Sequence, residues 1–103
     1  MFKSQTSYMF EKGEEWTLIT GATKGMGYDM ARALAARGRN LVLVSRDEKH
    51  LTRVARELNE ISDIIIMPID LSIPGSSEEL FNECERLGLR ISAMINNAGF
   101  GKS

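Results

Sequence analysis

The stretch TGATKGMG, residues 20–27, constrains the fold more than any other part of this 103-residue sequence. Its glycines, Gly21, Gly25 and Gly27, follow the apolar run WTLIT and precede a segment whose apolar residues recur at helical spacing. Glycine has no Cβ, so it lets a chain turn sharply out of a strand and lets backbone approach a phosphate closely. The start of the following helix offers free N–H groups and a positive dipole end. The pattern predicts a phosphate-binding strand–loop–helix unit, and an ordinary tight turn is the alternative.

Apolar runs and helical patterns alternate along the rest of the chain. Short runs rich in branched residues predict strands at 16–20, 41–44, 64–69 and 91–95. Helical spacing predicts a first helix over 25–37, a second after the N-cap Asp47, and a third capped by Ser76 or Ser77. The apolar stripe of the second helix is expected to comprise Leu51, Val54, Ala55, Leu58 and Ile61.

The predicted strands are apolar throughout, which is typical of parallel strands covered on both faces. Right-handed helical crossovers between such strands give an α/β fold, a doubly wound parallel sheet of Rossmann type, with strand order 3-2-1-4. We expect residues 1–15 to form an N-terminal arm and residues 16–103 a partial NAD(P)-binding Rossmann domain, truncated after the fourth strand.

Composition excludes several other classes. With 43% hydrophobic and 26% charged residues the chain is globular, and no apolar run approaches the roughly 20 residues of a membrane-spanning helix. A net charge of -1 with interspersed acids and bases argues against a nucleic-acid surface. The single cysteine, Cys84, excludes an internal disulfide and suits a reducing compartment, so we expect a cytoplasmic protein with no membrane partner.

The glycine loop resembles the cofactor loop of the short-chain dehydrogenases/reductases, and two further motifs agree with that family in type and order. Asp70, in the letters IDL after the third predicted strand, stands where the family places an aspartate near the adenine ring. The letters NNAG, residues 96–99, follow the fourth predicted strand, as they do in the family. Both motifs have an alternative reading as strand-ending turns.

The resemblance implies a nicotinamide dinucleotide cofactor and a hydride transfer between it and a small carbonyl or alcohol substrate. The residues that it places against the cofactor are Gly21, Thr23, Lys24, Gly25, Met26, Gly27, Ser45, Arg46, Asp70, Leu71, Asn97, Ala98 and Gly99. A different nucleotide motif, the P-loop, is suggested by the last letters GKS. That motif needs glycine at position 96, where the chain has Asn96, so the P-loop reading fails.

The end of the second predicted strand indicates which dinucleotide is bound. An acidic residue about 20 positions past the first glycine holds the ribose 2′-hydroxyl of NAD, but this sequence has Ser45 and Arg46 there. The planar guanidinium of Arg46 suits a 2′-phosphate, and similar family members use a basic residue at the place of Lys24. We therefore predict NADP(H). The alternative is that Arg46 and Lys24 are solvated surface charges, with Asp47 serving as a helix cap.

The catalytic residues of the family have no convincing match. The family uses a tyrosine with a lysine four residues later, and a serine, all well after NNAG. Tyr8 and Lys12 have that spacing but precede the first strand, and Tyr28 is followed at the same offset by Arg32. We assign no catalytic residue, and we assign no metal site because His50 stands alone.

The expected function is therefore that of the NADP(H)-binding portion of a short-chain oxidoreductase, with little or no activity of its own. A non-catalytic nucleotide-binding or regulatory module is the alternative. The fourth predicted strand, 91–95, would leave an apolar edge open, which predicts self-association and a homo-oligomer.

Overall fold

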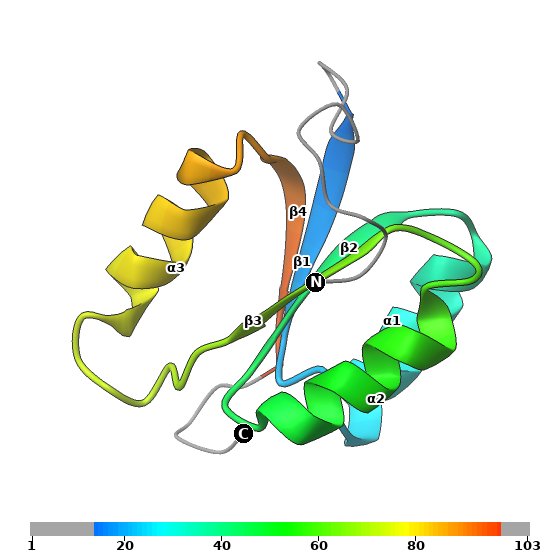
Figure 1. Ribbon diagram of the computed structural model, residues 1–103, viewed down its shortest axis with the longest axis horizontal. Helices are drawn as coiled ribbons and strands as arrows, with labels where there is room; N and C mark the ends of the chain where they lie inside the picture. The colour runs from blue at the N-terminus through cyan, green and yellow to red at the C-terminus, as the bar shows by residue number, and fades with distance from the viewer. Residues whose placement is uncertain (1–13, 98–103) are drawn as a thin grey trace.

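The computed structural model describes residues 14–97, in which strands and helices alternate (Figure 1). The elements are β1 (Glu15–Thr20), α1 (Gly25–Ala36), β2 (Asn40–Ser45), α2 (Glu48–Leu58), β3 (Ile64–Pro68), α3 (Ser76–Arg86) and β4 (Arg90–Asn96). All four strands run parallel in one sheet of order β3-β2-β1-β4. The predicted Rossmann-like fold and its strand order are confirmed.

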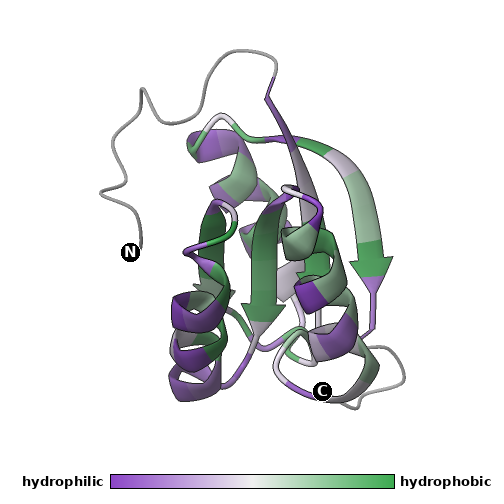
Figure 2. Ribbon diagram, turned by 90° about the vertical axis from the view of Figure 1, so that its right-hand side faces the viewer, coloured by the Kyte–Doolittle hydropathy of each residue, from purple (hydrophilic) through white to green (hydrophobic). Residues whose placement is uncertain are grey.

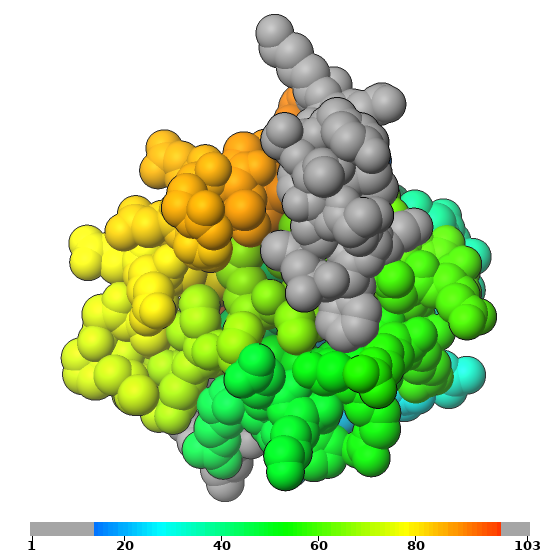
Figure 3. Space-filling view, viewed as in Figure 1, coloured from blue at the N-terminus to red at the C-terminus, as the bar shows by residue number. Residues whose placement is uncertain are grey.

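The sheet lies between two helical layers. Helices α1 and α2 cover one face and α3 covers the other, with the sheet seen nearly on edge between them (Figure 1). The strands are hydrophobic along most of their length, whereas the outer faces of the helices are hydrophilic (Figure 2). The edge strand β3 and the segment that follows it lie between the surfaces of α2 and α3 (Figure 3).

Each face of the sheet has its own apolar core because side chains alternate along a strand. Ile19, Leu41 and Leu43 pack under α1 and α2, and all three are fully buried. Leu18 and Val42, their neighbours along the chain, pack on the opposite face under α3. Burial on both faces explains why β1 and β2 are apolar without a polar alternation.

Helix α2 begins as predicted but ends earlier. The side chain of Asp47 accepts a hydrogen bond from the backbone N–H of His50 at 3.1 Å, which confirms it as the N-cap. Leu51, Val54, Ala55 and Leu58 form the expected buried stripe. The prediction for Ile61 is wrong, because the helix stops at Leu58 and the Ile61 side chain is 54% exposed in the connection to β3.

The start of α3 also differs from the prediction. The N-cap is Gly75, and no side chain caps the helix, so neither Ser76 nor Ser77 has the predicted role. Gly75 has φ 89°, a left-handed conformation that a serine would adopt only under strain. The backbone N–H of Ser76 donates a hydrogen bond to the carbonyl of Ile73 and closes a tight turn before α3. This turn therefore favours glycine at position 75.

Two expectations concern segments at the ends of the chain. The N-terminal arm, apart from its last two residues, and the Tyr8–Lys12 pair lie outside the described residues. β1 starts at Glu15, one residue before the predicted start of the domain. No helix within residues 14–97 is long and apolar enough to cross a bilayer.

Candidate functional site

The residues predicted to bind the cofactor lie directly after the four neighbouring strands, at the carboxyl ends of those strands. The strand register pairs Thr20 with Val44 on one side and with Asn96 on the other, and it pairs Ser45 with Pro68. The carboxyl ends of all four strands therefore meet. In open α/β sheets, ligands bind in the crevice at these carboxyl ends, where the strand order changes direction.

The glycine loop leaves the central strand β1 through two left-handed residues. Gly21 has φ 62° and Gly25 has φ 63°, values that residues with a Cβ rarely adopt. The backbone N–H of Gly21 donates to the carbonyl of Val44 at 2.9 Å, so the loop starts as a continuation of the sheet. It then turns within four residues into α1, which begins at Gly25.

Gly27 allows the first turn of α1 to pack directly on the loop and on the end of β4. A Cβ at this position would overlap the carbonyl oxygen of Gly21 and lie 2.5 Å from Nδ2 of Asn97. Any larger residue would push the helix away from both. The third glycine of the loop thus serves a close approach rather than a special backbone angle.

The N-terminus of α1 is open to an anion. Lys24 occupies the N-cap position in extended conformation, and no side chain accepts a hydrogen bond there. The first turn of α1 contains no acidic residue. Its free N–H groups and the positive end of its dipole thus face the loop, which is the arrangement that binds phosphates.

The buried hydroxyl of Thr20 joins the two central strands at the site. Thr20 Oγ1 donates to Oδ1 of Asn96 and accepts from the backbone N–H of Asn97, both at 2.9 Å. These bonds hold the end of β4 against the start of the glycine loop. Sequence reasoning missed Thr20, although a hydroxyl residue directly before the first glycine, opposite a polar strand end, was an available signal.

The ends of β2 and β3 bring Ser45, Arg46 and Asp70 together. Ser45 is buried, and its hydroxyl lies 3.5 Å from that of Thr23 in the glycine loop. Hydrogen bonds from the Ser72 hydroxyl and backbone N–H, followed by the positive charge of Arg46, hold the pKa of Asp70 below its ordinary value. The exposed Arg46 therefore stands close enough to Asp70 to stabilise its ionised form.

Asp70 has the turn-forming geometry that was its alternative reading. Its Oδ1 accepts from the backbone N–H of Ser72 at 3.0 Å and from the Ser72 hydroxyl at 2.7 Å. Within residues 14–97, no hydrogen bond is made to Oδ2. The carboxylate is thus fixed in place through Oδ1.

The other residues predicted to lie at the site differ in their exposure and in their contacts. The Met26 side chain is 68% exposed beside the loop, and Leu71 is half-buried against the core under α3. Asp47 is engaged by its cap bond and by the His50 ring, and the hydrogen bond from that ring lowers its pKa. Ala98 and Gly99 lie outside the described residues.

Among residues 14–97 no group of His, Cys, Asp and Glu side chains is arranged to hold a metal ion.

Tyr28 lacks the surroundings of a catalytic tyrosine. Its hydroxyl donates to the Glu57 carboxylate at 2.8 Å, and this hydrogen bond raises its pKa. Arg32, the residue four positions later, lies over the ring at 5.7 Å and 3.7 Å from Glu57. The three side chains link α1 to α2.

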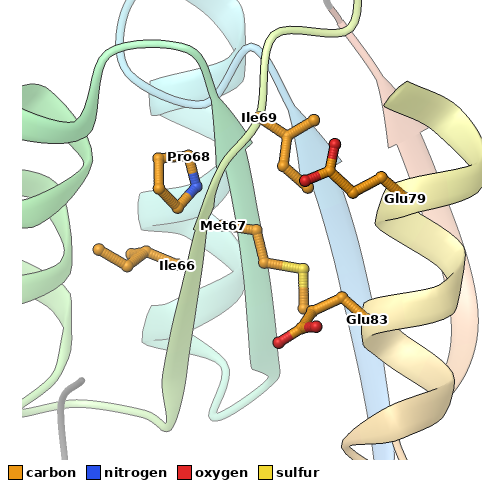
Figure 4. A pocket seen from close by; sticks show the side chains of 6 residues that line it. All are labelled: Ile66, Met67, Pro68, Ile69, Glu79 and Glu83. Atoms are coloured by element: carbon orange, nitrogen blue, oxygen red, sulfur yellow. The ribbon is translucent and has the colours of Figure 1, made fainter. Parts of the chain in front are cut away.

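A cavity of about 270 Å³ lies away from the predicted cofactor residues, between β3 and α3 (Figure 4). Met67 and Ile69 point from the strand side toward Glu79 and Glu83 on α3. None of the predicted cofactor residues lines this cavity.

Comparisons with known proteins agree with this geometry. The family model described as short chain dehydrogenase matches residues 15–103. The very-long-chain 3-oxoacyl-CoA reductase of Phaeosphaeria nodorum is 36% identical over 92 residues, which cover 85% of this chain and 27% of that protein.

Two solved structures are similar in fold and sequence. A short-chain dehydrogenase from Sphingobium yanoikuyae in complex with NADPH has a TM-score of 0.74 and 37% identity, covering 82% of this chain and 34% of that one. The Pseudomonas aeruginosa RhlG/NADP active-site complex has a TM-score of 0.76 and 27% identity, covering 92% and 38%. The chain thus spans well under half the length of these relatives.

The close approach at Gly27 predicts a ranking of two glycine substitutions. Gly25→Ala meets open space and is opposed only by its left-handed backbone, at a cost of about 1 kcal/mol. Gly27→Ala forces α1 away from Gly21 and Asn97, and we expect a loss of about 2–3 kcal/mol in the free energy of unfolding. Urea unfolding followed by circular dichroism measures both. Equal losses would show that the helix does not pack on the loop as described.

Proposed function

The chain belongs to the short chain dehydrogenase family, and we propose that it supplies the NADP(H)-binding portion of an oxidoreductase acting on a small carbonyl or alcohol. The observation that carries this proposal is the open N-terminus of α1 beside a loop kept slim by Gly21, Gly25 and Gly27. When bound, the dinucleotide would supply or accept the hydride. The residues described here would bind it and orient it.

We propose that each strand end holds a different part of the cofactor. The pyrophosphate would be bound by the free N–H groups at the start of α1, with the exposed Met26 side chain covering the dinucleotide. Asp70, through Oδ2, and Leu71 would border the adenine ring. Asn97 would lie along the cofactor, because Thr20 fixes its backbone beside the loop. The assignment of Ala98 and Gly99 to the same segment is part of the proposal.

The preference for NADP(H) rests on charge. No acidic residue ends β2, where NAD recognition needs one, and the positions there are Ser45 and Arg46. Asp47 is the acid next in sequence, but it is occupied as a helix cap. The positive charges of Arg46 and Lys24 would bind a 2′-phosphate. Two relatives of known structure hold NADPH or NADP, which supports the same choice.

Substitution of Arg46 tests this preference. We expect Arg46→Ala to weaken NADPH binding about 10- to 100-fold, because charge-assisted hydrogen bonds to phosphate are worth about 1.5–3 kcal/mol. NADH affinity should stay within about twofold, since NADH has no 2′-phosphate. Fluorescence titration with both cofactors measures this, and Arg37→Ala, an exposed arginine at the far end of α1, is the matched control. Equal affinity of the unaltered chain for NADH and NADPH would refute the assignment.

We further propose that this 103-residue chain alone transfers hydride poorly or not at all. Reduction of a carbonyl needs a proton donor beside the nicotinamide. Tyr28, the tyrosine within residues 14–97, donates to Glu57 on α2, and its raised pKa opposes that role. Loss of NADPH absorbance in the presence of a panel of small ketones should match the rate without protein. A protein-dependent rate abolished by Tyr28→Phe would contradict this.

A cytoplasmic location and self-association complete the proposal. A cytoplasmic location is supported by Cys84, which is a free and buried thiol. Self-association is supported by β4, which pairs with β1 along one edge and has no partner along the other among the described residues. Most of its residues are exposed, including Met94 at 47%.

The open edge of β4 predicts concentration-dependent association. Lysine on an edge strand opposes pairing with another strand, so we expect Met94→Lys to lower the mean mass at high micromolar concentration. Light scattering measures the mass. Ile73→Lys, which places the same charge at a 56% exposed site outside the sheet, is the control and should leave the mass unchanged. A monodisperse monomer for the unaltered chain would overturn the proposal.

A further inference from the structure

A second cavity, of about 410 Å³, adjoins the glycine loop. Thr23, Lys24 and Gly25 line it from the loop, and Tyr28 lines it from the first turns of α1. Arg53 and Glu57 line it from α2. The cavity thus extends from the start of α1 toward the middle of α2. Arg53 belongs to no motif recognised in the sequence.

Two cations in this cavity have no partner among the described residues. Neither Lys24 nor Arg53 forms an ion pair or a side-chain hydrogen bond within residues 14–97. Three other arginines, Arg32, Arg86 and Arg90, each lie within 4.0 Å of a carboxylate. Within residues 14–97, neither cation on the cavity wall is therefore neutralised by an ion pair.

The nearest candidate partner of Arg53 is occupied by another helix. Glu57 stands four residues after Arg53 on α2, a spacing at which opposite charges ordinarily pair. Here both oxygens of the Glu57 carboxylate accept from the Tyr28 hydroxyl at 2.8 Å, and Arg32 lies 3.7 Å from one of them. Tyr28 and Arg32, both on α1, thus hold Glu57 and leave the guanidinium of Arg53 available to a ligand.

The cavity begins where the cofactor-selecting residues stand. Thr23 lines the cavity, and its hydroxyl lies 3.5 Å from that of Ser45. Ser45 directly precedes Arg46 at the end of β2. Lys24, the second residue proposed to select NADP(H), lines the cavity itself. An anion held between Lys24 and Arg53 would therefore lie beside the place expected for the 2′-phosphate.

We propose that Arg53, which lines this cavity together with Lys24, is a specificity-determining residue of the subsite for the 2′-phosphate of NADP(H). The inference rests on the proposed function and adds a third cation, supplied by α2, to Lys24 and Arg46. The planar fork of arginine suits a phosphate monoester, which offers several acceptor oxygens in one group. Tyr28 acts as a positioning residue, because it keeps Glu57 from neutralising Arg53.

The first test compares matched arginine substitutions on α2. Arg53→Gln should weaken NADPH binding about tenfold, the effect of about 1.4 kcal/mol, and leave NADH within about twofold. Adenosine 2′-monophosphate should lose affinity in the same variant, whereas adenosine 5′-monophosphate should not. Arg56→Gln, an exposed arginine on the same helix outside the cavity, should change none of these values. Titration of the full chain with the four compounds measures them.

The second test concerns Tyr28. Tyr28→Phe releases Glu57 to pair with Arg53, so NADPH binding should weaken by about 1.5- to twofold with NADH unchanged, in line with a pair at this spacing. Adding Glu57→Gln to Tyr28→Phe should restore NADPH affinity. A purely structural role of Tyr28 would weaken both cofactors, and the second substitution would not rescue them.

The outcomes separate this inference from the function on which it rests. If the unaltered chain binds NADH as tightly as NADPH, or binds neither, the proposed function fails and the subsite fails with it. If it prefers NADPH but Arg53→Gln matches Arg56→Gln, only the role of Arg53 is overturned. Equal losses for NADPH and NADH in Arg53→Gln would also overturn it, since they would indicate a general effect on the fold.

Discussion

The close packing of α1 on the end of the sheet is the constraint on which the site depends. Gly27 brings the first turn of the helix against Gly21 and Asn97, at a distance that a Cβ would not permit. That contact points the open end of α1 at the crevice above the strands. The same contact joins β1 to β4, because Asn97 is in turn held by the hydroxyl of Thr20. Helix, loop and both central strands therefore meet at one point.

The electrostatic character of the site follows from which charges are already satisfied. Asp47 is taken up as a helix cap, Asp70 is held by Ser72, and Glu57 is held by α1. The acids near the crevice are thus engaged within the protein, whereas Lys24 and Arg53 are not engaged by any described residue. Among residues 14–97, Lys24 and Arg53 are therefore not paired with these carboxylates, and their charges can act on an anionic ligand.

Much of this was predictable from sequence because the strong signals act locally. Uniformly apolar runs mark strands buried on both faces, and glycines between a strand and a helix mark the phosphate loop. These signals were sufficient for strand order, the Asp47 cap and the family resemblance, all of which are confirmed. The errors arose where tertiary packing decides. The helical stripe continued past the true end of α2 to Ile61, and a backbone turn selected Gly75 over a serine cap.

Features that depend on contacts between elements distant in the sequence could not be predicted from the spacing of residues along the chain. The Arg53–Glu57 pair has the sequence signature of a helix ion pair, and only the position of Tyr28 on α1 shows that Glu57 is engaged elsewhere. Thr20 was overlooked for the same reason. Its role depends on the pairing of β4 with β1, and no periodicity along the chain predicts that these two strands are neighbours.

The hydrogen bond between Thr20 and Asn96 has a kinetic meaning as well. It joins residues separated by 76 positions, whereas the β1-α1-β2 unit closes over much shorter stretches. Closing a long stretch of chain loses conformational entropy before the contacts that it permits can stabilise the fold. Contacts of this kind therefore form slowly. The phosphate loop and α1 belong to the early, local unit, but the strand that completes their crevice arrives from the far end of the chain. We therefore expect the binding site to be among the last parts of the sheet to assemble.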